Sequence, residues 1–319
     1  MMLINILLIV VGIAMVLWGA DKMTEGASAL ARRLKVSEMV IGLTIVAAGT
    51  SAPELFVSLM SALKGTPDMA VGNVVGSNII NTLVIVGVTA MVMPIAIARR
   101  TVTKDMPFTV IATLLLMALT LDNFSSLNLW GNVISRLDGV ILLFAFAAFM
   151  YYTFTVAKTG GDEYQQSSAP KNVWLSLLLI VVGLGCLIFG SNIFVDNASA
   201  MAASLGVSES VIGLTIVAGG TSLPELATSV VAARKGQSAM AIGNVIGSNV
   251  FNILLILGLT ATVCPMQIGG ITVLDMGMMI VSVLLLWLFS WTKLTLARWE
   301  GAVLTLLYIG YLVWLLYNI

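Results

Sequence analysis

Two glutamates, Glu54 and Glu225, stand inside long apolar segments of the sequence. Each ends a nearly identical stretch, GTSAPE at 49–54 and GTSLPE at 220–225. A carboxylate at membrane depth costs at least ~2.5–3.5 kcal/mol, and no lysine or arginine of these segments is placed to neutralise it. The expected partner is therefore a mobile cation. The alternative is a pair of protonated glutamates that serve only packing, and the appearance of the acid at both positions argues against it.

Neutral oxygen donors accompany the two glutamates. They lie in GSNIIN at 76–81, in GSNVFN at 247–252 and beside the glutamates themselves; the candidate ligands are Ser77, Asn81, Ser248, Asn252, Thr50, Ser51, Thr221 and Ser222. The serine and the asparagine of each pair stand four apart, on one helix face. Taken singly, they could instead be interhelical hydrogen-bonding residues. Oxygen-only coordination with carboxylates selects hard ions such as Ca²⁺, Na⁺ or Mg²⁺.

The helices that hold the glutamates are predicted to break beside them. Pro53 and Pro224 cannot donate a backbone hydrogen bond, and Gly49 and Gly220 weaken the same turn further. Irregular backbone at membrane depth is tolerated only where it lines protein or a water-filled cavity. The freed carbonyl oxygens would then add to the ligand set.

Composition places these elements in a lipid bilayer. Of the 319 residues, 59% are hydrophobic and 9% charged, and the mean hydropathy is +1.06. This predicts an all-α integral membrane protein. Ten apolar stretches are long enough to span a bilayer: 3–31, 38–63, 69–97, 105–121, 137–157, 173–203, 209–235, 240–265, 271–291 and 296–317. The first has no basic start and no evident cleavage site, so it is interpreted as a retained helix.

The sequence contains an internal duplication. Residues 36–89 align without a gap with 207–260 at a constant offset of 171, and roughly three in five positions are identical. Each half of the chain holds one copy and five predicted spans. Because five is an odd number, the two halves must enter the membrane from opposite sides. The prediction is two inverted five-helix repeats, 1–158 and 173–319, joined by a short cytoplasmic linker at 159–172, with broken helices at the midplane.

The charged residues indicate the orientation. With the amino terminus outside, twelve lysines and arginines fall in cytoplasmic loops and only Lys64 and Arg136 in outer loops. This bias predicts that both termini lie outside the cytoplasm. Nucleic-acid binding has no support, because the basic residues are ordinary loop anchors. Glu25 and Asp196 are predicted to be solvated helix ends, although an entry funnel for cations is the open alternative.

Several chemistries are excluded by what the sequence lacks. There is no histidine, which removes the usual zinc, copper and haem sites and most catalytic triads. There is also no G-x-S-x-G turn, and no paired aspartates occur in adjacent spans, so no enzyme and no cofactor are expected. The two cysteines, Cys186 and Cys264, lie in apolar runs and are expected to be small packing residues.

The paired stretches GTSAPE with GNVVGSNIIN, and GTSLPE with GNVIGSNVFN, resemble the alpha repeats of the cation/calcium exchanger superfamily. Within it, the sequence is most similar to the prokaryotic sodium/calcium exchangers, over nearly its whole length. The resemblance implies four ion positions. Calcium would use Glu54 and Glu225 with backbone oxygens of Thr50 and Thr221. The two sodium positions would use Ala47, Ser51 and Ser248, and Ala218, Ser222 and Ser77, and the middle position Asn81 and Asn252.

The resemblance also implies a function and its alternatives. The expected activity is exchange of Na⁺ for Ca²⁺ across the cell (inner) membrane by a monomer, with one net charge moved per cycle and the first and sixth helices sliding over the others. Some relatives, including the potassium-dependent branch, have an aspartate where this chain has Asn252, so potassium independence is expected. A proton/calcium antiporter of the same superfamily is the nearest alternative, and a cation channel is a more distant one.

Overall fold

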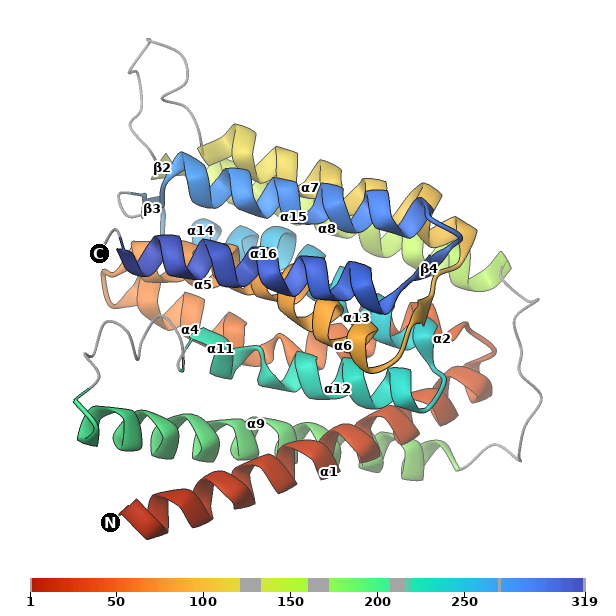
Figure 1. Cartoon of the computed structure of the whole chain (residues 1–319). Helices are drawn as coiled ribbons and strands as arrows, with labels where there is room; N and C mark the ends of the chain where they lie inside the picture. The colour runs from red at the N-terminus through yellow and green to blue at the C-terminus, as the bar shows by residue number, and fades with distance from the viewer. Residues whose placement is uncertain are drawn as a thin grey trace.

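The computed structural model describes residues 2–120, 133–159, 172–206, 216, 218–268 and 271–317. Nearly all of them are helical (Figure 1). The first half runs through α1 (Met2–Leu34), α2 (Glu38–Ile41), η1 (Gly42–Val46), α3 (Ala47–Thr50), α4 (Ala52–Leu63), α5 (Pro67–Ile80), η2 (Asn81–Ile85), α6 (Val86–Val92), β1 (Ile95–Ala96), η3 (Thr101–Asp105), α7 (Met106–Thr120), β2 (Val133–Ile134) and α8 (Arg136–Thr159).

The second half repeats this order. It runs through α9 (Val173–Ser204), α11 (Ala218–Thr221), α12 (Leu223–Arg234), α13 (Ser238–Val250), η6 (Phe251–Ile256), α14 (Leu257–Val263), β3 (Met266–Gln267), α15 (Val273–Trp291), β4 (Thr295–Leu296) and α16 (Arg298–Tyr317). The predicted linker at 159–172 lies almost wholly outside the described residues, as does the start of the predicted span 209–235.

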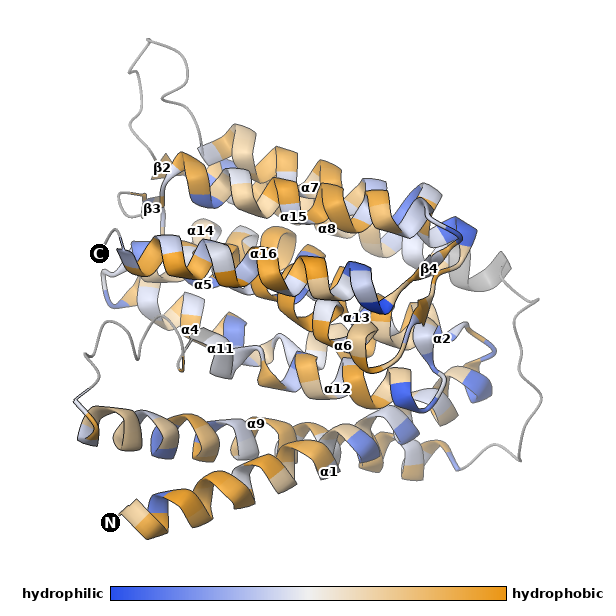
Figure 2. Cartoon of the chain, viewed as in Figure 1, coloured by the Kyte–Doolittle hydropathy of each residue, from blue (hydrophilic) through white to orange (hydrophobic). Residues whose placement is uncertain are grey.

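Helix length and surface chemistry confirm a multi-pass membrane protein. In the described part of the chain, eight helices are long and apolar enough to cross a bilayer, or nine if the bent pair Glu38–Thr50 and Ala52–Leu63 counts as one span. Large apolar side chains cover the outer helices; Leu3, Phe144, Trp174 and Leu306 are 79%, 74%, 77% and 64% exposed. In Figure 2 these helices are mostly orange, and blue gathers near connections such as the one before β4. Lipid is the natural solvent for such a surface.

Both predicted helix breaks are present. The helical stretch Glu38–Thr50 meets α4 at an angle of 46° around Ser51, whose backbone φ and ψ are −83° and 7°. Ser222 joins α11 to α12 with nearly the same angles, −88° and 2°. In each case a proline occupies the first turn of the following helix, where its missing N–H costs nothing.

The π-helical segments were not foreseen from the sequence. Segment η2 begins at Asn81, and η6 contains Asn252. A π turn bonds each N–H to the carbonyl five residues back and thereby rotates the side chains that follow. Asn81 is the first residue of η2 and Asn252 the second of η6, so both predicted ligands lie where the helix changes its turn. The all-α expectation also omitted two short antiparallel ladders, β1 with β4 and β2 with β3.

Helices α1 and α9 form a close antiparallel pair at the edge of the molecule (Figure 1). A methyl group built on the α1 glycines would meet the α9 backbone; the opposed positions are Gly12 with Gly190, Gly19 with Gly183, and Gly26 with Ser176. At Gly19 the added carbon would lie 2.6 Å from the Gly183 carbonyl oxygen. Small residues at heptad spacing therefore let the two backbones touch.

We expect Gly19→Val to separate this pair and lower the unfolding temperature of the purified protein by about 5 °C, because overpacking a tight contact costs about 1–3 kcal/mol. Gly185→Val is the matched control on α9, since a carbon added there meets nothing within 4 Å. Thermal unfolding in detergent measures both. Equal unfolding temperatures for the two variants would contradict the close contact.

Candidate functional site

The two predicted glutamates occupy equivalent positions directly after the helix breaks. Glu54 lies in the first turn of α4 and Glu225 in the first turn of α12, and each is only 1% exposed. The breaks bring the two elements together, so that the two carboxyl groups are close enough to interact electrostatically. The site is thus a pair of buried acids from opposite halves of the chain.

Hydroxyl groups from both halves surround the carboxylates. Ser51 Oγ donates to Glu225 Oε1 at 3.1 Å, which is a contact from the first copy to the second. The hydroxyls of Thr50 and Ser248 also lie near Glu225, and that of Thr221 lies near Glu54. Each half therefore contributes ligands to the acid of the other half. A site of this kind cannot form in one repeat alone.

Much of the buried polar surface at this site has no protein partner. The unpartnered buried atoms include Glu54 Oε2, Glu225 Oε2, Ser222 Oγ, Ser248 Oγ, Asn81 Oδ1 and both polar atoms of Asn252. Within the described ranges, no lysine or arginine nitrogen comes within 4 Å of Glu54 or Glu225. Buried charges and unpaired oxygens are costly, so this arrangement favours a bound cation.

The remaining predicted ligands are placed by contacts to other residues. Ser77 is buried, and Asn81 donates to Asn249 Oδ1 at 3.1 Å rather than to a glutamate. The Ala47 side chain packs against Gly247, where an added carbon would approach it to 2.7 Å. Ala218 belongs to α11, and its side chain is outside the described part.

Two asparagines that the sequence interpretation did not include hold the breaks in place. Asn244 Nδ2 donates to the Glu225 carbonyl oxygen at 3.3 Å and to Ser229 Oγ at 3.0 Å. Asn73 makes the same two bonds, with the same lengths, to the Glu54 carbonyl oxygen and Ser58 Oγ.

Asn244 also links the two copies. Its Oδ1 lies 3.2 Å from Thr50 Oγ1, whose single hydrogen it shares with the Val46 carbonyl oxygen at 3.1 Å. In the sequence, Asn73 and Asn244 could have been identified from the repeated G-N-V of GNVVGSN and GNVIGSN.

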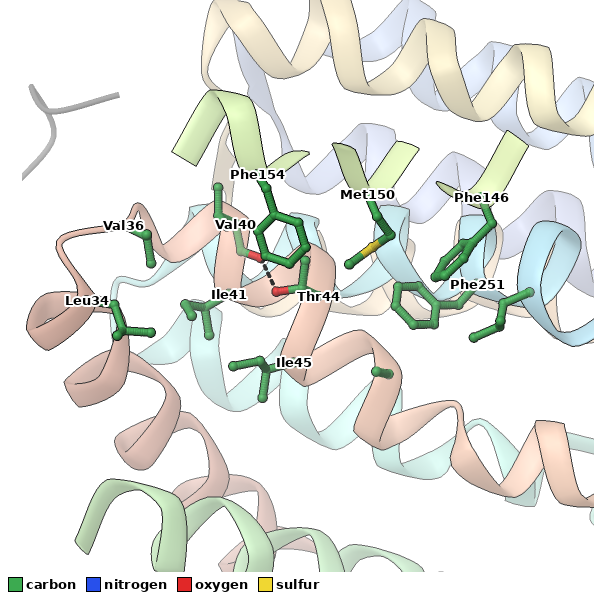
Figure 3. Close-up of a pocket in the computed structure, with 12 residues that line it drawn as sticks. Leu34, Val36, Val40, Ile41, Thr44, Ile45, Phe146, Met150, Phe154 and Phe251 are labelled. Atoms are coloured by element: carbon green, nitrogen blue, oxygen red, sulfur yellow. Dashed lines mark hydrogen bonds between the residues drawn. The ribbon is translucent and has the colours of Figure 1, made fainter. Parts of the chain in front are cut away.

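An apolar cavity of about 480 Å³ opens beside this site but does not belong to it. It lies between α2, η1, α8 and η6 and is lined by side chains such as Ile45, Met150 and Phe251 (Figure 3). Its one labelled hydroxyl, on Thr44, is already bonded to the Val40 carbonyl oxygen at 2.7 Å. The cavity therefore offers nothing to coordinate a cation, and the oxygen-lined centre remains the candidate site.

The acids of α1 are paired rather than simply solvated. Lys22 Nζ lies 3.2 Å from Asp21 and 3.1 Å from Glu25, and the Nζ of Lys235, the residue after α12, lies 2.7 Å from Asp21. Lys235 also donates to the Asp21 carbonyl oxygen at 2.8 Å. These contacts tie the middle of α1 to the end of α12. Asp196 is exposed on α9.

Comparison with known proteins agrees with this geometry. Residues 4–155 and 175–317 match the family model described as sodium/calcium exchanger protein. The chain is 39% identical to the putative antiporter CaxA of Alkalimonas amylolytica, over 97% of this chain and 98% of that protein. It is 33% identical to the sodium/calcium exchanger MaX1 of Methanosarcina acetivorans, over 99% and 100% of the two chains.

A solved structure shares the fold. The sodium-calcium exchanger NCX_Mj superimposes with a TM-score of 0.84 at 30% sequence identity, covering 98% of this chain and 99% of that one. The family model and the full-length relatives therefore agree with the resemblance seen in the duplicated segments. The chain belongs to the sodium/calcium exchanger family.

Proposed function

We propose that this protein is a secondary antiporter that exchanges Na⁺ for Ca²⁺ at the site built around Glu54 and Glu225. The observation that carries the proposal is the pair of buried carboxylates, each with an unpartnered oxygen. One Ca²⁺ or several Na⁺ balance the two negative charges, whereas an empty site leaves them unpaired. The empty carrier is then reluctant to change conformation, and this reluctance couples the two ion fluxes.

The ligand assignment that we propose follows the resemblance to the sodium/calcium exchangers. Calcium takes Glu54 and Glu225 with backbone oxygens of Thr50 and Thr221. Sodium takes two flanking positions and the asparagines form the middle position; the ligand sets are Ala47, Ser51 and Ser248, then Ala218, Ser222 and Ser77, then Asn81 and Asn252. Hydroxyls that reach across from one copy to the acid of the other support this assignment. No cofactor is needed beyond the transported ions.

The proposed architecture is ten spans in two inverted five-helix repeats. Equivalent contacts in the two copies support it: Gly87 packs against Gly301 as Gly258 packs against Gly139. The transporter resides in the inner membrane as a monomer with both termini outside the cytoplasm. Access alternates when α1 and α9, held together by their glycine contacts, slide over the remaining helices.

The decisive experiment is uptake of ⁴⁵Ca²⁺ by proteoliposomes loaded with Na⁺ in potassium-free buffer. We expect uptake to require the outward Na⁺ gradient. An inside-positive potential should accelerate it, because three Na⁺ leaving for one Ca²⁺ entering moves one charge outward, worth roughly 2.3 kcal/mol per 100 mV. Uptake that follows a pH gradient and ignores Na⁺ would identify a proton/calcium antiporter instead. Uptake without any counter-ion would identify a channel.

A further inference from the structure

A directed chain of buried hydrogen bonds crosses between the two copies next to the proposed middle position. Asn81 Nδ2 donates to Asn249 Oδ1 at 3.1 Å, and Asn249 Nδ2 donates to Thr82 Oγ1 at 2.9 Å. The Thr82 hydroxyl donates in turn to the Asn78 carbonyl oxygen at 2.9 Å. Asn81, Thr82 and Asn249 are 1%, 0% and 2% exposed, so water does not compete for these bonds.

The chain fixes which end of each amide faces which neighbour. Because the single hydrogen of the Thr82 hydroxyl is used on the Asn78 carbonyl, its oxygen can only accept from Asn249. The NH₂ group of Asn249 must therefore face Thr82, and its oxygen must face Asn81. The NH₂ group of Asn81 is then used as the donor to Asn249, which leaves Asn81 Oδ1 buried and without a partner.

The second copy lacks this chain. Adding the offset of 171 places Asn252 opposite Asn81 and Ile253 opposite Thr82, and Asn78 is the counterpart of Asn249. Ile253 is fully buried and has no hydroxyl, and Asn78 Nδ2 instead donates to Val74 O of its own helix at 2.9 Å. Both polar atoms of Asn252 remain without a partner in the described structure. Asn81 and Asn252 are thus chemically identical, but the amide group of Asn81 is held in one orientation and that of Asn252 is not.

We propose that Thr82 is a positioning residue that acts through Asn249 to present Asn81 Oδ1 as a pre-oriented oxygen ligand, and so makes the two sides of the ion site unequal. This inference rests on the proposed function, since it names the role of Asn81 in cation binding. Segment η2, which begins at Asn81, packs against α12, where Glu225 lies. A fixed oxygen binds a cation more tightly than an amide that must first be turned, because the orientation is already set.

The test is the substitution Thr82→Val, which keeps the shape and removes the hydroxyl. We expect the Ca²⁺ concentration for half-maximal uptake to rise about tenfold while the maximal rate changes less than about threefold, since one buried hydrogen bond is lost but neither glutamate changes. Thr82→Ser restores the hydroxyl and should bring the half-maximal concentration back to within about twofold of the unmodified protein.

Thr89→Val is the matched control. It makes the same substitution at another buried hydroxyl on the helical segment that follows, and Thr89 Oγ1 has no partner. The half-maximal concentration should not change in this variant. A shift as large as that of Thr82→Val would show a general packing effect and overturn the inference.

The double variant Thr82→Val with Ile253→Thr moves the hydroxyl to the other copy, where it can accept from Asn78 and orient Asn252. We expect it to recover most of the lost Ca²⁺ affinity. If the two substitutions were independent packing defects, their losses of affinity would instead add. An additive loss, or a Thr82→Val variant with unchanged affinity, would overturn the inference. Equilibrium ⁴⁵Ca²⁺ binding to the purified variants separates this outcome from failure of the proposed function, because binding is measured without any exchange.

Discussion

Glu54→Gln and Glu225→Gln should each reduce Na⁺-dependent Ca²⁺ uptake by a factor of about 10²–10³. Each substitution keeps the size of the side chain but removes one of two buried charges, and breaking one partner of a buried ionic interaction costs about 3–5 kcal/mol. With only one carboxylate left, neither a divalent ion nor a set of sodium ions is fully balanced. The measurement is initial ⁴⁵Ca²⁺ uptake by proteoliposomes that contain equal amounts of folded protein.

The same variants should remain folded in the absence of Ca²⁺. Removing one of two like charges relieves their mutual repulsion, so the unfolding temperature in chelator should be unchanged or higher. The stabilisation that added Ca²⁺ gives to the unmodified protein should disappear, because a ligand stabilises only the state that binds it. This thermal shift separates loss of the ion from loss of the fold.

Glu300→Gln is the matched control for both glutamates. Glu300 is also 1% exposed, but it accepts hydrogen bonds from Ala297 N and Thr292 Oγ1, at 2.7 and 2.6 Å, at the start of α16. We expect this variant to lose stability and to keep its exchange activity per folded molecule. Retained exchange in Glu54→Gln or Glu225→Gln would remove that residue from the site.

The main elements of the site could be predicted because their causes are local in the sequence. A proline lacks a backbone donor wherever it stands, so Pro53 and Pro224 predict the breaks around Ser51 and Ser222. An acid within a long apolar run must be buried, and Glu54 and Glu225 are. The duplication placed the same chemistry in both halves, which singled out these residues among the fifteen acids of the chain.

The contacts that join the two copies could not be predicted in the same way. Ser51 binds the acid of the opposite copy rather than its own, and this depends on how the halves pack. The π segments at Asn81 and Asn252 have no sequence signal of their own. The ion pair between Asp21 and Lys235 joins residues more than two hundred positions apart, so no local pattern in the sequence predicts it. The duplication marks Asn73 and Asn244 as an equivalent pair but does not indicate what they bind. Their role became apparent only in the structure, where they bind the carbonyl oxygens of Glu54 and Glu225.

Asn244→Ala should impair binding and stability together. Asn244 bonds to the Glu225 carbonyl oxygen, to Ser229 Oγ and to Thr50 Oγ1, and it is fully buried. Its removal leaves a small cavity and unpaired polar groups, at a cost of about 2–4 kcal/mol. It also frees the first turn of α12 to move relative to Thr50. We therefore expect a lower unfolding temperature and a Ca²⁺ concentration for half-maximal uptake raised by about tenfold or more.

Asn73→Ala is the internal comparison for this prediction. Asn73 bonds to Glu54 O and Ser58 Oγ, both within its own copy, whereas Asn244 also accepts the hydroxyl of Thr50 from the other copy. If the link between copies holds the two breaks in register, Asn244→Ala must raise the half-maximal Ca²⁺ concentration more than Asn73→Ala does. Equal effects would mean that each asparagine serves only its own helix pair. The register of Glu54 and Glu225 would then have to come from the helix packing around them, because the hydrogen bond from Thr50 would have no measurable part in it.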